Sequence, residues 1–255
     1  MKTLCCILFA LSLRVGGEDL QIAVASNFLP TLRELVKVFE ADSAYEVGLS
    51  PGSTGKLYAQ ILNGAPFDLF FAADAERPLL LEEKGVVIKG NRFSYAIGKL
   101  VLWSPRPDFI DDSGRILSTD HFRHLSIANP ELAPYGLAAK ELLKSLDLWE
   151  DLEPKLVRGA NIAQTAQYVH SGAAELGFIA LAQIQVPGKT ISGSHWCPPT
   201  DSYPAIRQEG VVLTNTPAAE AFMAFMQTET AKDLIRAYGY DLPKEETHAL
   251  VSGRP

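Results

Sequence analysis

The sequence has few cysteines, no long apolar run and no basic cluster, and each of these absences excludes a class of protein. Three cysteines in 255 residues cannot build a disulfide-rich scaffold, so the fold must depend on a hydrophobic core. No apolar stretch reaches the ~20 residues that a membrane-spanning helix needs. Lys and Arg total 23 against 30 Asp and Glu, without any Lys/Arg-rich run. This charge balance argues against a nucleic-acid partner, because phosphate backbones require a basic footprint.

Residues 1–17 are typical of a secretory signal peptide. Lys2 precedes the apolar run 4–13, and the small residues of 15–17 suit cleavage. The apolar run is well below the ~20 residues of a membrane anchor. Cleavage near residue 17 would leave Cys197 as the remaining cysteine. We therefore expect an exported, periplasmic protein that folds without an internal disulfide.

From residue 20 onward, short apolar segments alternate with segments of helical period. This alternation predicts an α/β fold with mixed, mostly parallel sheets, arranged as two βαβαβ units. The expected strands are 20–25, 45–49, 67–73, 100–103, 125–128, 155–158, 176–180 and 211–214. The expected helices lie around 30–39 and 57–62 and at 137–146, 162–170, 217–226 and 231–238.

The two units predict two domains with a ligand cleft between them. No low-complexity linker separates the units, so we expect the chain to cross between them twice, near Ile97 and near Tyr203. Domain I would comprise 18–97 and 204–255, and domain II would comprise 98–203.

Small or polar residues follow four of the predicted strands. In open α/β sheets ligands collect beyond the carboxyl ends of the strands, and helix N-termini offer free N–H groups and a partial positive charge there. The four junctions are Ser26-Asn27, 52–55, 129–136 and 159–162. Each could be an ordinary helix cap, and Tyr135 could be a packing residue. Together, two in each unit, they favour an anion site made without a cationic side chain.

The sequence also contains a partial hydrolase motif. Residues 48–52 match G-x-S-x-G, which would make Ser50 the nucleophile of a secreted serine hydrolase. The next residue is Pro51, which has no N–H to donate to an oxyanion, and this argues against the hydrolase. The histidines lack the spacing of a metal site. We therefore expect no catalytic residue, no cofactor and no direct metal-ion ligand.

Five stretches resemble the periplasmic molybdate-binding proteins of ATP-driven ABC importers. They are AVASNF (23–28), PGSTGKLYAQILNGAPFDLFFAAD (51–74), NPELAPYGLAAKELL (129–143), LGFIALAQ (176–183) and YPAIRQEGVVL (203–213). The run GSTGKLYAQI followed by GAPFDLF is specific to that family. The resemblance implies a two-domain, type II Venus-flytrap fold that closes on tetrahedral molybdate or tungstate and delivers it to a membrane permease.

The resemblance also implies the residues that bind the oxyanion. Those of domain I would be Ser26, Asn27, Ser53 and Thr54, and those of domain II would be Tyr135 and the backbone N–H of Ile162. Some relatives have a tyrosine at the position of Ala180. Here Asn27 and Tyr135 would supply the missing donor.

The chemistry of the anions agrees with a site made of donors. Molybdate is fully deprotonated at neutral pH, so all its oxygens accept hydrogen bonds. Hydrogenphosphate carries a proton that needs an acceptor, and a buried site without a carboxylate should reject it. With the resemblance, this favours a binding protein for molybdate or tungstate, which we expect to be a monomer. The alternatives are a binding protein for another oxyanion such as sulfate, a secreted hydrolase acting from Ser50, and a ligand-sensing module that docks a membrane partner.

Overall fold

The computed structural model describes residues 19–87 and 90–243. The predicted signal peptide, residues 1–17, and the end of predicted domain I, residues 244–255, lie outside the described residues. Within the described part of the chain, every helix is too short or too polar to cross a membrane.

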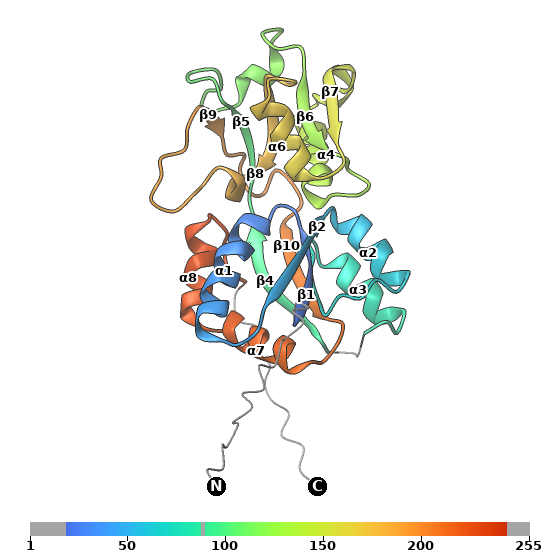
Figure 1. The fold of residues 1–255 in the computed structure, drawn as a ribbon. Helices are drawn as coiled ribbons and strands as arrows, with labels where there is room; N and C mark the ends of the chain where they lie inside the picture. Colours follow the sequence, from blue (N-terminus) through green and yellow to red (C-terminus); the bar gives the residue numbers. More distant parts are fainter. Residues whose placement is uncertain (1–18, 88–89, 244–255) are drawn as a thin grey trace, which may run out of the picture.

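The described chain forms two α/β halves, each built on a five-stranded sheet and placed end to end (Figure 1). The first sheet has the order β2-β1-β3-β10-β4, with β1 (Leu20–Ala25), β2 (Val47–Gly52), β3 (Leu69–Phe71), β4 (Arg92–Gly98) and β10 (Ile206–Val212). The second has the order β7-β6-β8-β5-β9, with β5 (Leu100–Ser104), β6 (Leu125–Ala128), β7 (Leu156–Gly159), β8 (Leu176–Ala180) and β9 (Ser194–Trp196).

Both sheets are mixed. Strand β1 pairs in parallel with β2 and β3, and β6 pairs in parallel with β7 and β8. Strand β10 is antiparallel to β3 and β4, and β5 is antiparallel to β8 and β9. The predicted α/β class with mixed sheets is therefore confirmed.

The chain passes between the sheets at two places. Strand β4 ends at Gly98 and β5 begins at Leu100, and the return lies between Trp196 and Ile206. These changes of sheet support domain boundaries at 97/98 and 203/204, which stay a prediction. Near the end of the described chain, the backbones of Asp241 and Ile97 exchange hydrogen bonds of 2.7 and 3.1 Å, which ties this segment to the first half.

Helices cover both faces of each sheet. On the first sheet, α1 (Leu29–Asp42), α7 (Pro217–Met226) and α8 (Glu229–Ala237) lie on one face, and α2 (Thr54–Leu62) and α3 (Glu76–Glu83) on the other (Figure 1). The second half has α4 (Pro134–Ser145), the short α5 (Trp149–Leu152) and α6 (Ile162–His170). Short 3-10 helices occupy 115–118, 153–155 and 181–183.

The apolar stripes of the sequence become the core. In α1 the side chains of Leu32, Leu35 and Phe39 are buried at the helical spacing that the sequence shows. Burial of each such side chain stabilises the fold by about 1.5–3 kcal/mol. Pro51 lies in β2, an edge strand, where its missing N–H costs no hydrogen bond to an inner neighbour.

Several element bounds differ from the sequence-based prediction. The predicted strand 45–49 is β2 at 47–52, because residues 50–52 pair with β1 although Ser-Pro-Gly is typical of a loop. The predicted helix 137–146 begins three residues earlier, with Pro134 in its first turn. Strands β4 and β9, helix α3 and the start of β10 have no counterpart in the prediction. The charged residues of β4, α3 and β10 and the Gly/Ser/Pro-rich context of β9 hide their periodicity.

Gly136 offers a test of how closely α4 packs on the end of β6. A Cβ at Gly136 would meet the carbonyl group of Ala128, with its carbon 2.7 Å away. We expect Gly136→Ala to lower the free energy of unfolding by about 1–3 kcal/mol in denaturant titrations, because backbone atoms must shift. Leu137→Ala, on the same helix but 41% exposed, should change it by about 0.5 kcal/mol or less. Equal stability of the two variants would contradict this packing.

Candidate functional site

The four polar junctions of the sequence meet where the two halves touch. The N–H of Gly55, at the start of α2, donates to the carbonyl of Leu132 at 3.0 Å. The N–H of Asn129 donates to the carbonyl of Gly159 at 2.8 Å, which joins the two junctions of the second half. Ile162 and Tyr135 belong to the same buried cluster as residues of the first half, including Ala25. The halves are therefore in a closed arrangement around these junctions.

All six predicted oxyanion-binding residues are buried. None of their exposed fractions exceeds 5%. The residues are Ser26, Asn27, Ser53, Thr54, Tyr135 and Ile162. None carries a charged side chain, so an anion here must be held by neutral donors and helix N-termini.

Ser53 has a buried hydroxyl that lacks a partner. It is the residue before the first turn of α2, yet its side chain makes no capping hydrogen bond. Within the described residues, its Oγ is buried without any hydrogen-bond partner. An unpaired buried polar group costs about 1–3 kcal/mol, which is unusual in a folded protein and is expected where a ligand supplies the partner.

Thr54 has a different environment. Its Oγ1 accepts a hydrogen bond from the N–H of Ala73 at 3.0 Å. This bond holds the segment after β3 against the start of α2. Thr54 therefore already has a structural contact, whereas Ser53 does not.

The amide of Asn27 is committed to other side chains. Its Nδ2 donates to Oε1 of Gln208 at 2.8 Å and to the hydroxyl of Tyr240 at 3.2 Å. The Tyr240 hydroxyl donates to the backbone carbonyl of Asn27 at 3.0 Å. Both amide protons therefore have acceptors in this structure, and the role of Asn27 in binding the anion stays a prediction.

Tyr135 reaches from the second half to the first. It lies in the first turn of α4, and its hydroxyl accepts a hydrogen bond from Nε2 of Gln208 at 3.2 Å. Burial raises the pKa of Tyr135 well above its ordinary value of about 10, so the hydroxyl keeps its proton at neutral pH. Tyr135 is therefore a neutral group that can donate a hydrogen bond.

Ile162 is the first residue of α6, where backbone N–H groups have no intrahelical acceptor. The preceding Asn161 caps the helix by accepting from the N–H of Gln164 at 2.9 Å. The carbonyl of Ile162 accepts from Nε2 of Gln183 at 3.1 Å, and Oε1 of Gln183 accepts from the N–H of Ala180 at 2.9 Å. Gln183 thereby joins the end of β8 to the start of α6.

Three residues of this region were not identified from the sequence: Gln208, Tyr240 and Arg77. Gln208 lies in the stretch 203–213, and a fully buried glutamine in a strand is itself a signal of a polar network. Arg77 pairs with Asp74 at 3.0 Å and donates to the carbonyl of Glu131 at 3.4 Å, across the boundary between the halves. Neither Tyr240 nor Arg77 belongs to one of the four junctions.

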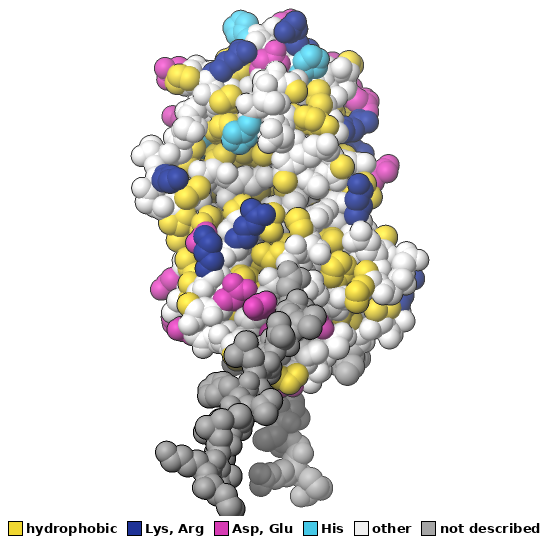
Figure 2. Space-filling model, viewed as in Figure 1, with side chains coloured by type: hydrophobic (Ala, Val, Ile, Leu, Met, Phe, Trp, Pro, Cys, Tyr) yellow, Lys and Arg dark blue, Asp and Glu magenta, His cyan; other side chains and the backbone are white. Residues whose placement is uncertain are grey.

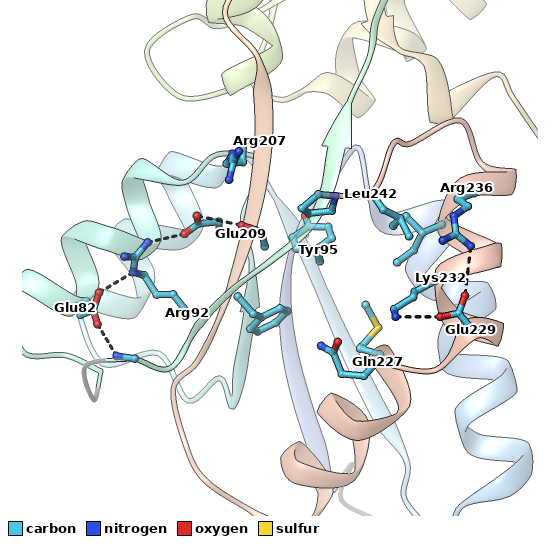
Figure 3. Close-up of a pocket in the computed structure, with 16 residues that line it drawn as sticks. Glu82, Arg92, Tyr95, Arg207, Glu209, Gln227, Glu229, Lys232, Arg236 and Leu242 are labelled. Atoms are coloured by element: carbon cyan, nitrogen blue, oxygen red, sulfur yellow. Dashed lines mark hydrogen bonds and ion pairs between the residues drawn. The ribbon is translucent and has the colours of Figure 1, made fainter. Parts of the chain in front are cut away.

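A pocket of about 780 Å³ lies elsewhere, over the outer edge of the first sheet (Figure 3). None of the six predicted residues lines it. Arg92, which does, lies 2.7 Å from Glu82 and 2.6 Å from Glu209, and Lys232 lies 3.0 Å from Glu229. Because these cations are already paired with carboxylates, the pocket is a poorer place for an anion than the junctions.

One face of the molecule shows no basic patch. In the view of Figure 2, basic and acidic side chains of the described residues are interspersed over both halves. The net charge of the chain is −7. Neither this face nor the net charge favours an anion.

The comparisons with known proteins identify relatives of the whole described chain. The family model described as bacterial extracellular solute-binding protein matches residues 20–241. The molybdate-binding protein ModA of Azotobacter vinelandii is 48% identical over 89% of this chain and 91% of its own. ModA of Rhodobacter capsulatus is 41% identical over 92% of each chain. The solved structure of the Azotobacter vinelandii periplasmic molybdate-binding protein has a TM-score of 0.86 at 43% identity, covering 89% of this chain and 100% of that chain.

The buried tyrosines predict a loss of stability at alkaline pH. Burial raises the pKa of Tyr95, Tyr135 and Tyr240 above the ordinary value. Above pH ~10 these phenols ionise in the unfolded chain but stay protonated in the fold, so unfolding releases protons and stability falls as pH rises. Each contributes a slope of about 1.4 kcal/mol per pH unit. In denaturant titrations at pH 9–11, Tyr95→Phe should have a shallower slope than the wild type, and an equal slope would contradict the assignment.

Proposed function

This chain belongs to the bacterial extracellular solute-binding proteins, and we propose on that premise that it binds molybdate or tungstate and delivers the anion to an ABC-type importer. Its α/β fold of two halves is the two-domain solute-binding fold, as the likeness to the solved molybdate-binding protein shows. The relatives are binding proteins and not enzymes.

The observation that carries the site assignment is the Ser53 hydroxyl. It is buried, lies two residues before the Gly55 contact with the second half, and lacks a partner within the described residues. An oxyanion oxygen supplies the acceptor that this hydroxyl lacks. Ser26, Tyr135 and the N–H of Ile162 lie at the other junctions that meet there, so the anion would receive hydrogen bonds from both halves.

Neutral donors favour an anion that carries no proton. Every oxygen of molybdate or tungstate accepts, and each donor in the site finds a partner. Hydrogenphosphate brings a hydroxyl whose proton would stay unpaired, at a cost of about 1–3 kcal/mol. Sulfate is aprotic as well, so its rejection depends on its smaller size.

Binding and closure are coupled in this proposal. Contacts such as Gly55 to Leu132 and Gln208 to Tyr135 join the two halves and require the closed arrangement. An anion that bonds to both halves stabilises this arrangement over any in which they are apart. The closed form would then be the one presented to the importer. We further propose that residues 1–17 direct export to the periplasm and that the protein acts as a monomer.

The hydrolase alternative is disfavoured by the position of Ser50. The nucleophile of a G-x-S-x-G motif sits on a sharp turn between a strand and a helix. Ser50 lies inside β2, paired with Ala23 of β1, and Pro51 follows it.

Titration calorimetry tests the function directly. The chain from residue 18, stripped of bound anion, should bind molybdate and tungstate tightly with one site and give no heat with sulfate or phosphate. Heat from sulfate alone would mean that the ligand is sulfate, while the site assignment would stand. Silence from all four anions would overturn the proposal in favour of a sensor or an enzyme.

Substitution of the serines tests the site. Ser53→Ala and Ser26→Ala should each weaken molybdate binding by about 1–3 kcal/mol, or roughly 5- to 150-fold in Kd, because a charged acceptor loses a buried donor. Ser50→Ala is the matched control and should leave Kd unchanged, which would also remove the hydrolase. Unchanged affinity in both Ser53→Ala and Ser26→Ala would refute the site.

A further inference from the structure

Gln208 connects the two halves through one buried amide group. Its side chain, on β10, has no exposed surface. Oε1 accepts from Nδ2 of Asn27 at 2.8 Å, and the Tyr95 hydroxyl shares its one proton between Oε1 and the backbone carbonyl of Ala72, each at 2.9 Å. Nε2 donates to the hydroxyl of Tyr135 at 3.2 Å. Asn27 and Tyr95 belong to the first half and Tyr135 to the second, so the amide spans the boundary.

The polarity of this amide determines what the Tyr135 hydroxyl can do. An amide oxygen only accepts and an amide nitrogen only donates. A hydroxyl oxygen that accepts from Nε2 of Gln208 keeps its own proton for another acceptor. With the amide reversed, Tyr135 would donate to Gln208 and turn a lone pair toward the anion.

The contacts of Tyr240 and Asn27 agree with this orientation of the Gln208 amide. The Tyr240 hydroxyl gives its proton to the carbonyl of Asn27, which can only accept. Its oxygen therefore accepts from the Asn27 side chain, which places Nδ2 on that side. The same Nδ2 faces Gln208, and only Oε1 of Gln208 can accept from it.

Gly98 makes the contact possible. It is the last residue of β4, at the crossing between the halves. A Cβ at this position would meet the Tyr135 hydroxyl and would lie 2.6 Å from Nε2 of Gln208. A glycine therefore allows the amide and the hydroxyl to come together at the crossing.

We propose that Gln208 is a positioning residue that holds the Tyr135 hydroxyl as a donor toward the bound anion, and that it thereby sets the discrimination against protonated anions. This inference rests on the proposed function. Molybdate accepts from Tyr135 in this arrangement. Hydrogenphosphate needs an acceptor for its own proton, and a Tyr135 hydroxyl fixed as a donor offers none.

The test compares two anions of equal charge on Gln208→Met. This variant keeps the side-chain length and removes both polar atoms, so the Tyr135 hydroxyl is free to rotate and to accept. At pH 8 molybdate and hydrogenphosphate both carry two negative charges. Each anion is titrated calorimetrically, and the two are titrated in competition where binding is weak. The Kd for molybdate should rise about tenfold. The ratio of the hydrogenphosphate Kd to the molybdate Kd should fall about tenfold or more. Gln227→Met, at an exposed position of the first half, is the matched control and should change neither value.

A double-mutant cycle separates positioning from packing. In a Tyr135→Phe background there is no hydroxyl to orient, so Gln208→Met should weaken molybdate binding less than about threefold and leave the ratio unchanged. If the fold increase in Kd of the double variant equals the product of the increases in the two single variants, Gln208 does not act through Tyr135 and the inference is wrong.

Gln208→Leu keeps the test decisive if Gln208→Met does not fold. This variant also removes both polar atoms, so the Tyr135 hydroxyl is again free to rotate and to accept. The ratio of Kd values should again shift toward hydrogenphosphate. If the wild type binds molybdate but the variants weaken the binding of both anions by the same factor, the role of Gln208 is wrong and the proposed function stands. A wild type that does not bind molybdate would overturn the proposed function and this inference together.

Discussion

Buried polar groups must find partners, and this requirement organises the contact between the two halves. Asn27, Gln208, Tyr95, Tyr135 and Tyr240 satisfy it with one another and with backbone carbonyls. Within the described residues, the hydroxyls of Ser53 and Thr31 do not. A paired network is rigid and leaves little freedom for repacking. The Ser53 hydroxyl, at the start of α2, is then an unpaired donor available to a ligand.

The same requirement explains how a protein of charge −7 holds an anion. Neutral hydroxyls and helix N-termini supply partial positive charge, and in a site closed to water these interactions are much stronger than in solvent. Arg77, which donates to a backbone carbonyl of the second half, is already paired with Asp74 at 3.0 Å. Selectivity can then come from the direction of each hydrogen bond and from size, with no need for a full positive charge that would attract every anion alike.

Much of the fold could be predicted from the sequence, and the reason lies in apolar periodicity. The bounds of α6 and β8 agree with the prediction because, apart from Thr165, their buried residues are apolar or glycine throughout their length. Strands β4 and β10 were missed or shortened because Arg92, Gln208 and Glu209 find polar partners only in the folded chain. For the site, the sequence indicates which junctions matter. It cannot show that the Asn27 amide is taken by Gln208 and Tyr240 while the Ser53 hydroxyl is left unpaired, because those pairings depend on residues 180 or more positions away.

In the proposed site, uncharged donors alone hold the anion between the halves. A crystal structure of the protein with bound tungstate is the sharpest test, because the metal locates the anion without ambiguity. We expect a tetrahedral anion at the meeting of the four junctions, with the Ser53 hydroxyl, the Tyr135 hydroxyl and the N–H of Ile162 within hydrogen-bond distance of its oxygens. An anion bound to a lysine or arginine side chain, or in the pocket over the edge of the first sheet, would show that the site is elsewhere or needs a full positive charge.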